Sequence, residues 1–240
     1  MVSAGRHDTR NMAELQLYDK LLTLPLFQGM SKDELSHVVA HIKLGFEKFA
    51  AQETLVQAGD SCDHLTFVLN GEVEVHATAD DQGYELTESL PSPMVIQPQH
   101  LFGLVQRHSR TFTAHTDCST LQLRKEEVGK LIRQSAIFRI NLLNLLSTQS
   151  QRLLHRPWQP VPPSLASRIA SFLASHCLQP TGEKHFKIKM TRLAEELNDS
   201  RLDISHALNH LQKQGLLILS RGKIDVPDME KLLLDTGGSL

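Results

Sequence analysis

The stretch NDSRLDISHALNHLQKQG, residues 198–215, decides how the end of the chain folds. Ser200 is a typical N-cap residue, and Asp203 stands three positions later, at the reciprocal position of a capping box. Gly215 is the residue type that ends helices in the left-handed conformation. We therefore expect a helix between Ser200 and Gly215. Its spacing predicts one buried side, formed by Ile204, Ala207, Leu208 and Leu211.

The opposite face of this helix carries groups that could contact base edges in the major groove of DNA. Arginine, histidine, serine and asparagine can form hydrogen bonds there, and an apolar side chain can touch a thymine methyl group. The candidate base-contacting residues are Arg201, Leu202, Ser205, His206 and Asn209.

Together with its flanking segments, this helix has the pattern of a known DNA-binding arrangement. A short helix, RLAEEL, precedes it across a turn at Asn198-Asp199, and LLILS-RG-KIDV follows as two strands joined at Arg221-Gly222. Two helices, a tight turn and a hairpin predict a winged helix-turn-helix. Its cations would bind phosphates without reading sequence; these are Lys189, Arg192, Lys213, Arg221 and Lys223, with Lys184 and Lys187 nearby. The alternative is a winged helix that docks proteins instead of DNA.

Composition limits the class of protein. The 240 residues are 40% hydrophobic and 22% charged, as in ordinary globular chains, and their length suits about two domains. The net charge is −2, and residues 160–240 carry 10 basic and 9 acidic side chains, so DNA binding must come from local placement of charge. Without an apolar run of about 18 residues or a signal peptide, we expect a cytoplasmic protein with no membrane partner.

Cysteines and catalytic motifs exclude several chemistries. Cys62, Cys118 and Cys177 lie far apart, so we expect buried thiols and neither a disulfide nor an iron–sulfur cluster nor any other metal site. His-x-His, Gly-x-Ser-x-Gly, Walker and HExxH motifs do not occur. We therefore predict that the protein is not an enzyme and has no catalytic residues.

The front of the chain predicts helices followed by an antiparallel β domain. Residues 15–43 have helical patterning, with a capping box at Ser31 and Glu34. Residues 48–123 hold short alternating segments separated by glycines and prolines, which is typical of an antiparallel sandwich or barrel.

A long helix between residues 137 and 154 has two apolar stripes. One stripe is Phe138, Leu142, Leu145, Gln149 and Arg152, and the other is Leu143, Leu146 and Leu153. Either the helix is buried on both sides, or it lies on its own β domain while one stripe pairs with a second copy. The proline-rich stretch RPWQPVPPS then forms a stiff connector at a domain boundary.

Four segments together resemble the CRP/FNR superfamily of bacterial transcription regulators. They are LPLFQGMSKDEL, ETLVQAGDSCDHLTFVLNGEVEV, RTFTAHTDCSTLQLRKEEVGKLI and MTRLAEELNDSRLDISHALNHLQKQGLL with the following RGK. The resemblance implies an α+β fold: an effector-sensing β-roll (15–134), a dimerisation helix (135–156), a hinge (157–163) and a winged helix-turn-helix (164–235). It also implies a homodimer on two-fold symmetric DNA, with RNA polymerase as a further partner. Among the two stripes we assign Phe138, Leu142, Leu145, Gln149 and Arg152 to dimerisation.

The resemblance places the effector site at Gly103, Leu104, Arg110 and Thr111. Nucleotide-binding members carry a glutamate where this chain has Leu104, and their loop before the arginine is longer. These departures argue against cyclic AMP, although Arg110 could still pair with an anion. Haem is an alternative cofactor in the family, with His64, His76, His100, His108 and His115 as candidate ligands. The effector itself is left open by the sequence.

Overall fold

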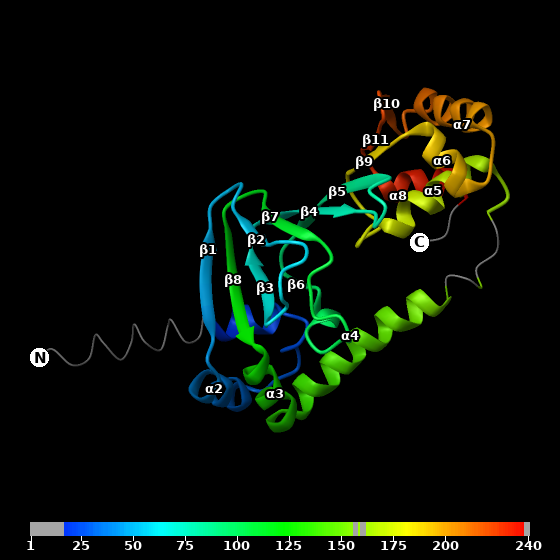
Figure 1. Cartoon of the computed structure of the whole chain (residues 1–240). Coiled ribbons are helices and arrows are strands. Elements are labelled where there is room, and N and C mark those ends of the chain that lie inside the picture. The colour runs from blue at the N-terminus through cyan, green and yellow to red at the C-terminus, as the bar shows by residue number, and fades with distance from the viewer. Residues whose placement is uncertain (1–16, 156–157, 159–161, 238–240) are drawn as a thin grey trace, which may run out of the picture.

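The computed structural model describes residues 17–155, 158 and 162–237. Figure 1 shows a β-roll joined by a long helix to a smaller C-terminal domain. Residues 17–23 are helical. The roll then contains α2 (Lys32–His41), β1 (Gly45–Phe49), β2 (Thr54–Val56), β3 (His64–Asn70), β4 (Glu72–Thr78), β5 (Tyr84–Pro91), β6 (Met94–Ile96), η1 (Pro98–His100), β7 (Thr111–Ala114), β8 (Cys118–Arg124) and α3 (Lys125–Gln134).

Local sequence signals explain where the first of these elements begin. The predicted capping box at α2 is present: the Ser31 hydroxyl accepts from the Glu34 amide at 3.3 Å, and the Ser31 amide donates to the Glu34 carboxylate at 2.8 Å. Burial alternates along β4, where Val73 and Val75 are fully buried, as expected for a strand with one face in the core. The predicted antiparallel β domain is therefore confirmed.

Helix α4 (Ala136–His155) lies with one stripe against its own roll. Phe138 is fully buried with its ring centroid 5.4 Å from that of Phe27, and Leu142 is buried in the same core. These two side chains have no surface to offer a second copy, which corrects their assignment to dimerisation. The rest of that stripe, Leu145, Gln149 and Arg152, lines a hollow of about 350 Å³ beside Pro25.

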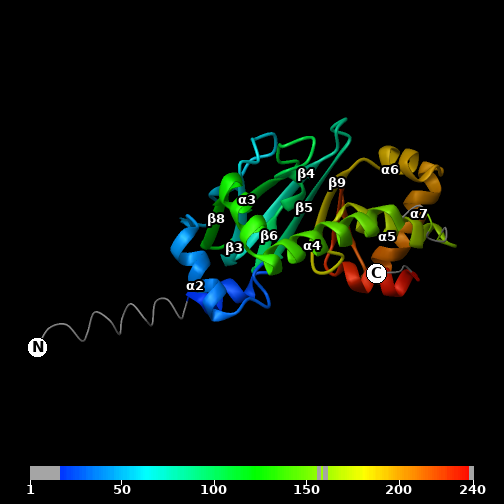
Figure 2. The ribbon, with the colours of Figure 1, turned by 90° about the horizontal axis from the view of Figure 1, so that it is seen from below.

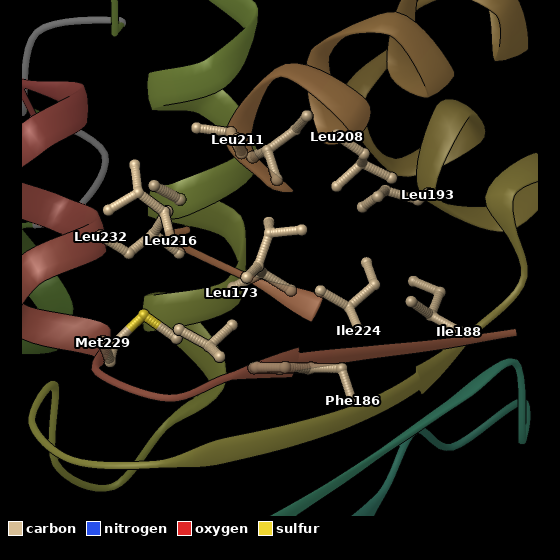
Figure 3. Packing of buried hydrophobic residues seen from close by; sticks show 14 of the residues in the cluster. Leu173, Phe186, Ile188, Leu193, Leu208, Leu211, Leu216, Ile224, Met229 and Leu232 are labelled. Atoms are coloured by element: carbon tan, nitrogen blue, oxygen red, sulfur yellow. The ribbon is translucent and has the colours of Figure 1, made fainter. Parts of the chain in front are cut away.

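The C-terminal domain is built around one apolar core. Its elements are α5 (Leu165–His176), β9 (Lys184–Ile188), α6 (Met190–Leu197), α7 (Arg201–Lys213), β10 (Ile218–Ser220), β11 (Lys223–Val226) and α8 (Met229–Thr236). Figure 3 shows side chains from all of the helices and from β9 and β11 meeting in this core, among them Leu173, Phe186 and Leu208. Helix α8 was not expected; Asp228 caps it, and Met229, Leu232 and Leu233 bury its inner side.

One sheet crosses from the roll into the C-terminal domain. Its seven strands run in the order β10-β11-β9-β5-β4-β7-β2, beside a four-stranded sheet of order β1-β8-β3-β6. Strands β5 and β9 pair antiparallel from Tyr84↔Ile188 to Glu88↔Lys184, and Figures 1 and 2 both show them side by side. The two parts of the molecule are thus joined by backbone pairing. Most of the predicted hinge, 157–163, lies outside the described residues.

Candidate nucleic-acid interface

The helix-turn-helix is held by its turn and by α5. Asn198 ends α6 in the left-handed conformation, with φ of 48°, and its amide donates to the Ala194 and Glu195 carbonyls. Arg168 of α5 forms an ion pair with Asp199 and donates to the Leu197 carbonyl. This fixes the angle between α6 and α7.

The start of α7 is capped largely as predicted. The Ser200 hydroxyl accepts from the Asp203 amide at 3.0 Å and donates to the Asp203 carboxylate at 2.6 Å. The Ser200 amide, however, donates to the Asp199 carboxylate at 2.8 Å instead of to Asp203. The capping box is therefore incomplete, because the preceding turn residue supplies the second acceptor.

The two sides of α7 separate as the spacing predicts. Ile204, Leu208 and Leu211 are buried, whereas Leu202 is 67% exposed. Arg201, His206, Asn209 and Lys213 are exposed as well, and Ser205 is half-buried. The Asn209 amide nitrogen donates to the Ser205 carbonyl one turn earlier at 2.7 Å, which orients its side chain along the helix. The polar face is thus rigidly carried and open to a partner.

The wing continues the exposed surface beside α7. Strands β10 and β11 pair with Ser220 opposite Lys223, and Gly222 takes a positive φ of 72° that allows the tight turn. Arg221 and Lys223 are exposed at its tip, and Lys189 is exposed at the start of α6. These cations are exposed on the same domain as the outer face of α7.

Three other predicted phosphate contacts are occupied by carboxylates of the roll. Arg192 lies 2.7 Å from Asp81 and 2.6 Å from Glu196, and Lys187 lies 3.0 Å from Glu85. Lys184 is fully buried, with its Nζ atom 3.0 Å from Oε2 of Glu88. In this arrangement Arg192 and Lys184 do not act as phosphate contacts, which corrects the sequence-based assignment.

Arg110 takes part in the same buried cluster. Its guanidinium donates to Glu88 Oε1 at 3.1 Å and to the His176 carbonyl at the end of α5 at 2.9 Å. The Leu178 amide donates to Glu88 Oε1 as well, at 2.8 Å. Cys177 borders the cluster, and burial, then the Glu88 charge, raises the pKa of its thiol to about 12, so the thiol stays protonated.

The predicted effector residues do not converge on one site. Leu104 is fully exposed, and Gly103 packs so closely that an added Cβ would lie 2.8 Å from the Gln99 carbonyl. The Thr111 hydroxyl accepts from the Ala58 amide at 3.1 Å. Arg110 donates to Glu88 and to the His176 carbonyl within the protein. The phosphate site that the resemblance suggested is therefore not formed in this structure.

Some candidate haem ligands have hydrogen-bond partners within the protein, and the others lie apart from them. Both ring nitrogens of His76 and of His100 have hydrogen-bond partners at 3.3 to 3.4 Å. His108 is buried, with Nδ1 3.2 Å from Gln97 Oε1, and burial lowers its pKa. His64 and His115 lie elsewhere, on β3 and after β7. These five histidines do not converge on a shared haem site.

Two kinds of feature are absent from the described part of the chain. No group of three or more histidine, cysteine or acidic side chains there could hold a metal ion. Within the same residues, no helix has the length and hydropathy needed to cross a membrane. All three cysteines are free and buried, as predicted.

The sequence was compared with protein-family models and curated proteins. The cyclic nucleotide-binding domain matches residues 46–135, and the Crp-like helix-turn-helix domain matches residues 167–234. The cAMP-activated global transcriptional regulator Vfr of Pseudomonas aeruginosa is 24% identical over 71% of this chain and 83% of its own length. The cAMP-activated global transcriptional regulator CRP of Haemophilus influenzae is 25% identical over 85% and 93%.

Solved structures share the fold over most of the chain. The catabolite activator protein of Thermus thermophilus has a TM-score of 0.50 at 22% identity and covers 88% of this chain and 99% of its own. A CRP/FNR-family regulator from Eubacterium rectale has a TM-score of 0.52 at 22% identity, with 89% and 98% covered. The roll and the winged helix match the family's two domains in the family's order. The chain therefore belongs to the CRP/FNR family of transcription regulators, with a sensor of the cyclic nucleotide-binding type and a DNA-binding helix-turn-helix domain.

Proposed function

We propose that the chain acts as a homodimer that binds a two-fold symmetric promoter site and adjusts transcription by RNA polymerase. The observation that carries this is the rigid, exposed face of α7 beside a cationic wing. In helix-turn-helix proteins the second helix enters the major groove, and dimers bind half-sites about one helical turn, roughly 34 to 36 Å, apart. The same geometry is expected here.

The side chains divide into two roles on DNA. Base edges would be contacted by Arg201, Leu202, Ser205, His206 and Asn209, and phosphates by Lys189, Lys213, Arg221 and Lys223. Arginine pairs best with guanine, and Leu202 offers an apolar contact to the methyl group of thymine. A target site that contains both features is therefore expected.

An exposed face of α4, which includes Leu143 and Leu153 of the second stripe, supports the dimer. Ile140 is 53% exposed and Leu143 56% exposed, and Leu153 and Leu154 are exposed further along the helix. Ile140, Leu143 and Leu154 share a heptad spacing with Ser147 and Ser150 between them. An apolar seam on a helix whose other side is already buried needs a partner, and a second copy of α4 would provide it.

We propose that cyclic AMP is not the effector of the roll. Arg110 is bound to Glu88 and His176, and Leu104 points into solvent where a ribose-binding carboxylate would be required. We expect cyclic AMP to leave the thermal midpoint of the protein unchanged in a melting experiment. A concentration-dependent rise that Arg110→Ala abolishes would contradict this, because a ligand that binds only the native state must stabilise it.

Selection of duplexes from a random-sequence pool tests the DNA-binding function. Bound duplexes should be enriched for a two-fold symmetric motif, and their affinity should fall steeply with salt, as expected for a protein that contacts several phosphates. Failure to bind any duplex at low salt would favour the alternative, a sensing module that acts through protein contacts.

A further inference from the structure

The hairpin β4–β5 of the roll faces the DNA-binding domain with a row of carboxylates. Asp81 in its turn pairs with Arg192 of α6, Glu85 on β5 pairs with Lys187 of β9, and Glu88 on β5 pairs with Lys184 of β9. Each of these three carboxylates thus meets one cation of the DNA-binding domain, and Arg192 also lies 2.6 Å from Glu196 of its own helix. We name this three-pair contact, Asp81–Arg192, Glu85–Lys187 and Glu88–Lys184, the hairpin clamp.

The contact is built into the fold rather than limited to exposed ion pairs. Leu86 of β5 enters the core of the C-terminal domain beside Phe186, and the Tyr84 hydroxyl lies 2.9 Å from Nε2 of His176. The Glu88 and Lys184 side chains are both fully buried. Backbone pairing of β5 with β9 runs through the same residues. Exposed ion pairs alone would contribute little, whereas a buried one requires its partner to be present.

The cations in the hairpin clamp are near the surface proposed to bind DNA. Lys187 stands directly opposite Lys223 of the wing in the β9–β11 register. Arg192 lies in the first turns of α6, the helix that in helix-turn-helix proteins crosses the DNA backbone. A carboxylate bound to either cation removes a phosphate contact, and it also places negative charge close to the DNA.

We propose that the β4–β5 hairpin is an intramolecular competitor of DNA, whose carboxylates hold Arg192 and Lys187 away from phosphates and keep the DNA-binding domain in a low-affinity state. Release of the hairpin clamp raises DNA affinity. Arg110 links the device to the sensor, since this one side chain donates both to Glu88 and to His176 of the DNA-binding domain. The inference rests on the proposed DNA-binding function.

Neutral variants of the full-length protein test the competition. Asp81→Asn and Glu85→Gln together should tighten binding to a fluorescein-labelled duplex roughly 5-fold or more, in the range of ordinary allosteric couplings. The salt dependence should steepen by about one unit per released phosphate contact. Asp80→Asn is the matched control, because Asp80 carries the same charge in the same turn and forms no ion pair among the described residues. Equal effects of control and double variant would overturn the proposal.

A reversible crosslink tests the same idea in the opposite direction. Thr87 and His185 are register partners on β5 and β9, and antiparallel partners have Cα atoms about 4.5 to 5.5 Å apart, within the disulfide range. With Thr87→Cys and His185→Cys, the oxidised protein should bind the duplex at least about 5-fold more weakly than the same protein after reduction. The buried native thiols would not compete.

The outcomes separate the two proposals. Equal or tighter binding by the oxidised form would overturn the hairpin clamp as an inhibitor while leaving DNA binding intact. Absence of duplex binding in the wild type, the reduced crosslink variant and the Asp81→Asn/Glu85→Gln variant alike would overturn DNA binding itself, and the inhibitor with it.

Discussion

At the scale of single residues, Glu88 is the side chain on which the contact between the two parts of the chain depends most. It is fully buried between Lys184 and Arg110, so its single carboxylate opposes two cations. The Lys184 ammonium lies 3.0 Å from Glu88 Oε2, so the two buried charges attract each other directly. Removing the carboxylate would leave both cations without compensation.

We therefore expect Glu88→Gln to lower the free energy of unfolding by about 3 to 5 kcal/mol. Glu85→Gln is the control, because its ion pair with Lys187 is largely exposed and should contribute about 1 kcal/mol or less. Urea unfolding of the two variants compares them. Equal midpoints would show that the buried cluster is not needed for stability.

Specificity on DNA is also decided by single side chains. Arg201→Ala should cost about 1 to 3 kcal/mol in binding and relax the preference at one base pair. Lys223→Ala should weaken binding to every sequence alike and reduce the salt slope by about one. Anisotropy titrations on a set of single-base-pair variants separate these effects. Unchanged preference in Arg201→Ala would remove that residue from base recognition.

His108 predicts an acid sensitivity of the roll. Burial, followed by the nearby His100, lowers its pKa below the ordinary value of 6.5. The unfolded chain therefore takes up a proton before the folded chain does, so stability is present above about pH 6.5 and is lost as pH falls through the folded pKa. His108→Gln should flatten that decline in unfolding measurements between pH 7 and 5, whereas a variant of exposed His37, His37→Gln, should retain it. An unaltered decline in His108→Gln would assign the sensitivity elsewhere.

At the scale of single elements, α4 has one side buried against the roll and one side exposed. Leu142 faces the roll core and Leu143, its neighbour, faces outward. Leu143→Glu should give folded monomers at concentrations where the wild type is dimeric, because it places a charge in the proposed seam. Leu142→Glu should instead unfold the roll, since it buries an unpaired charge. Light scattering with circular dichroism distinguishes the two results; a dimeric Leu143→Glu variant would place the interface on another surface.

The elements also show what the sequence could predict. Caps at Ser31 and Ser200, and the helical spacing of α7, are local signals, and each appears in the structure at the expected residues. The choice between the stripes of α4 could not be made locally, because both have helical spacing and only the packed roll shows which one is buried. Helix α8 was missed, although Pro227 and Asp228 mark the end of the wing and the start of a helix.

One part of the candidate site, the exposed face of α7, was also predictable from local helical spacing. The exposed face of α7 follows from its buried face and needs no knowledge of the rest of the chain. By contrast, the roll partners of Lys184, Lys187 and Arg192 lie about one hundred positions earlier, on β5 and in the turn that precedes it. Charge alone identifies these side chains as phosphate contacts, and only tertiary pairing reveals that carboxylates already occupy them.

At the scale of the whole molecule, one sheet joins the sensor domain to the DNA-binding domain. The continuous pairing from β2 through β5 and β9 to β10 connects the roll's hairpin to the wing through neighbouring strands. Coupling between distant sites requires an element with two arrangements that both sites bias. The β5–β9 junction, with Arg110 and Glu88 at one end, is the element proposed for that role.

Hydroxyl-radical footprinting on a duplex selected from a random pool would show whether a dimer reads symmetric DNA with α7. Two equivalent protected regions, related by two-fold symmetry and centred about one helical turn or a multiple of it apart, are predicted. A single unsymmetrical protected region, or uniform cleavage with no protection, would contradict it.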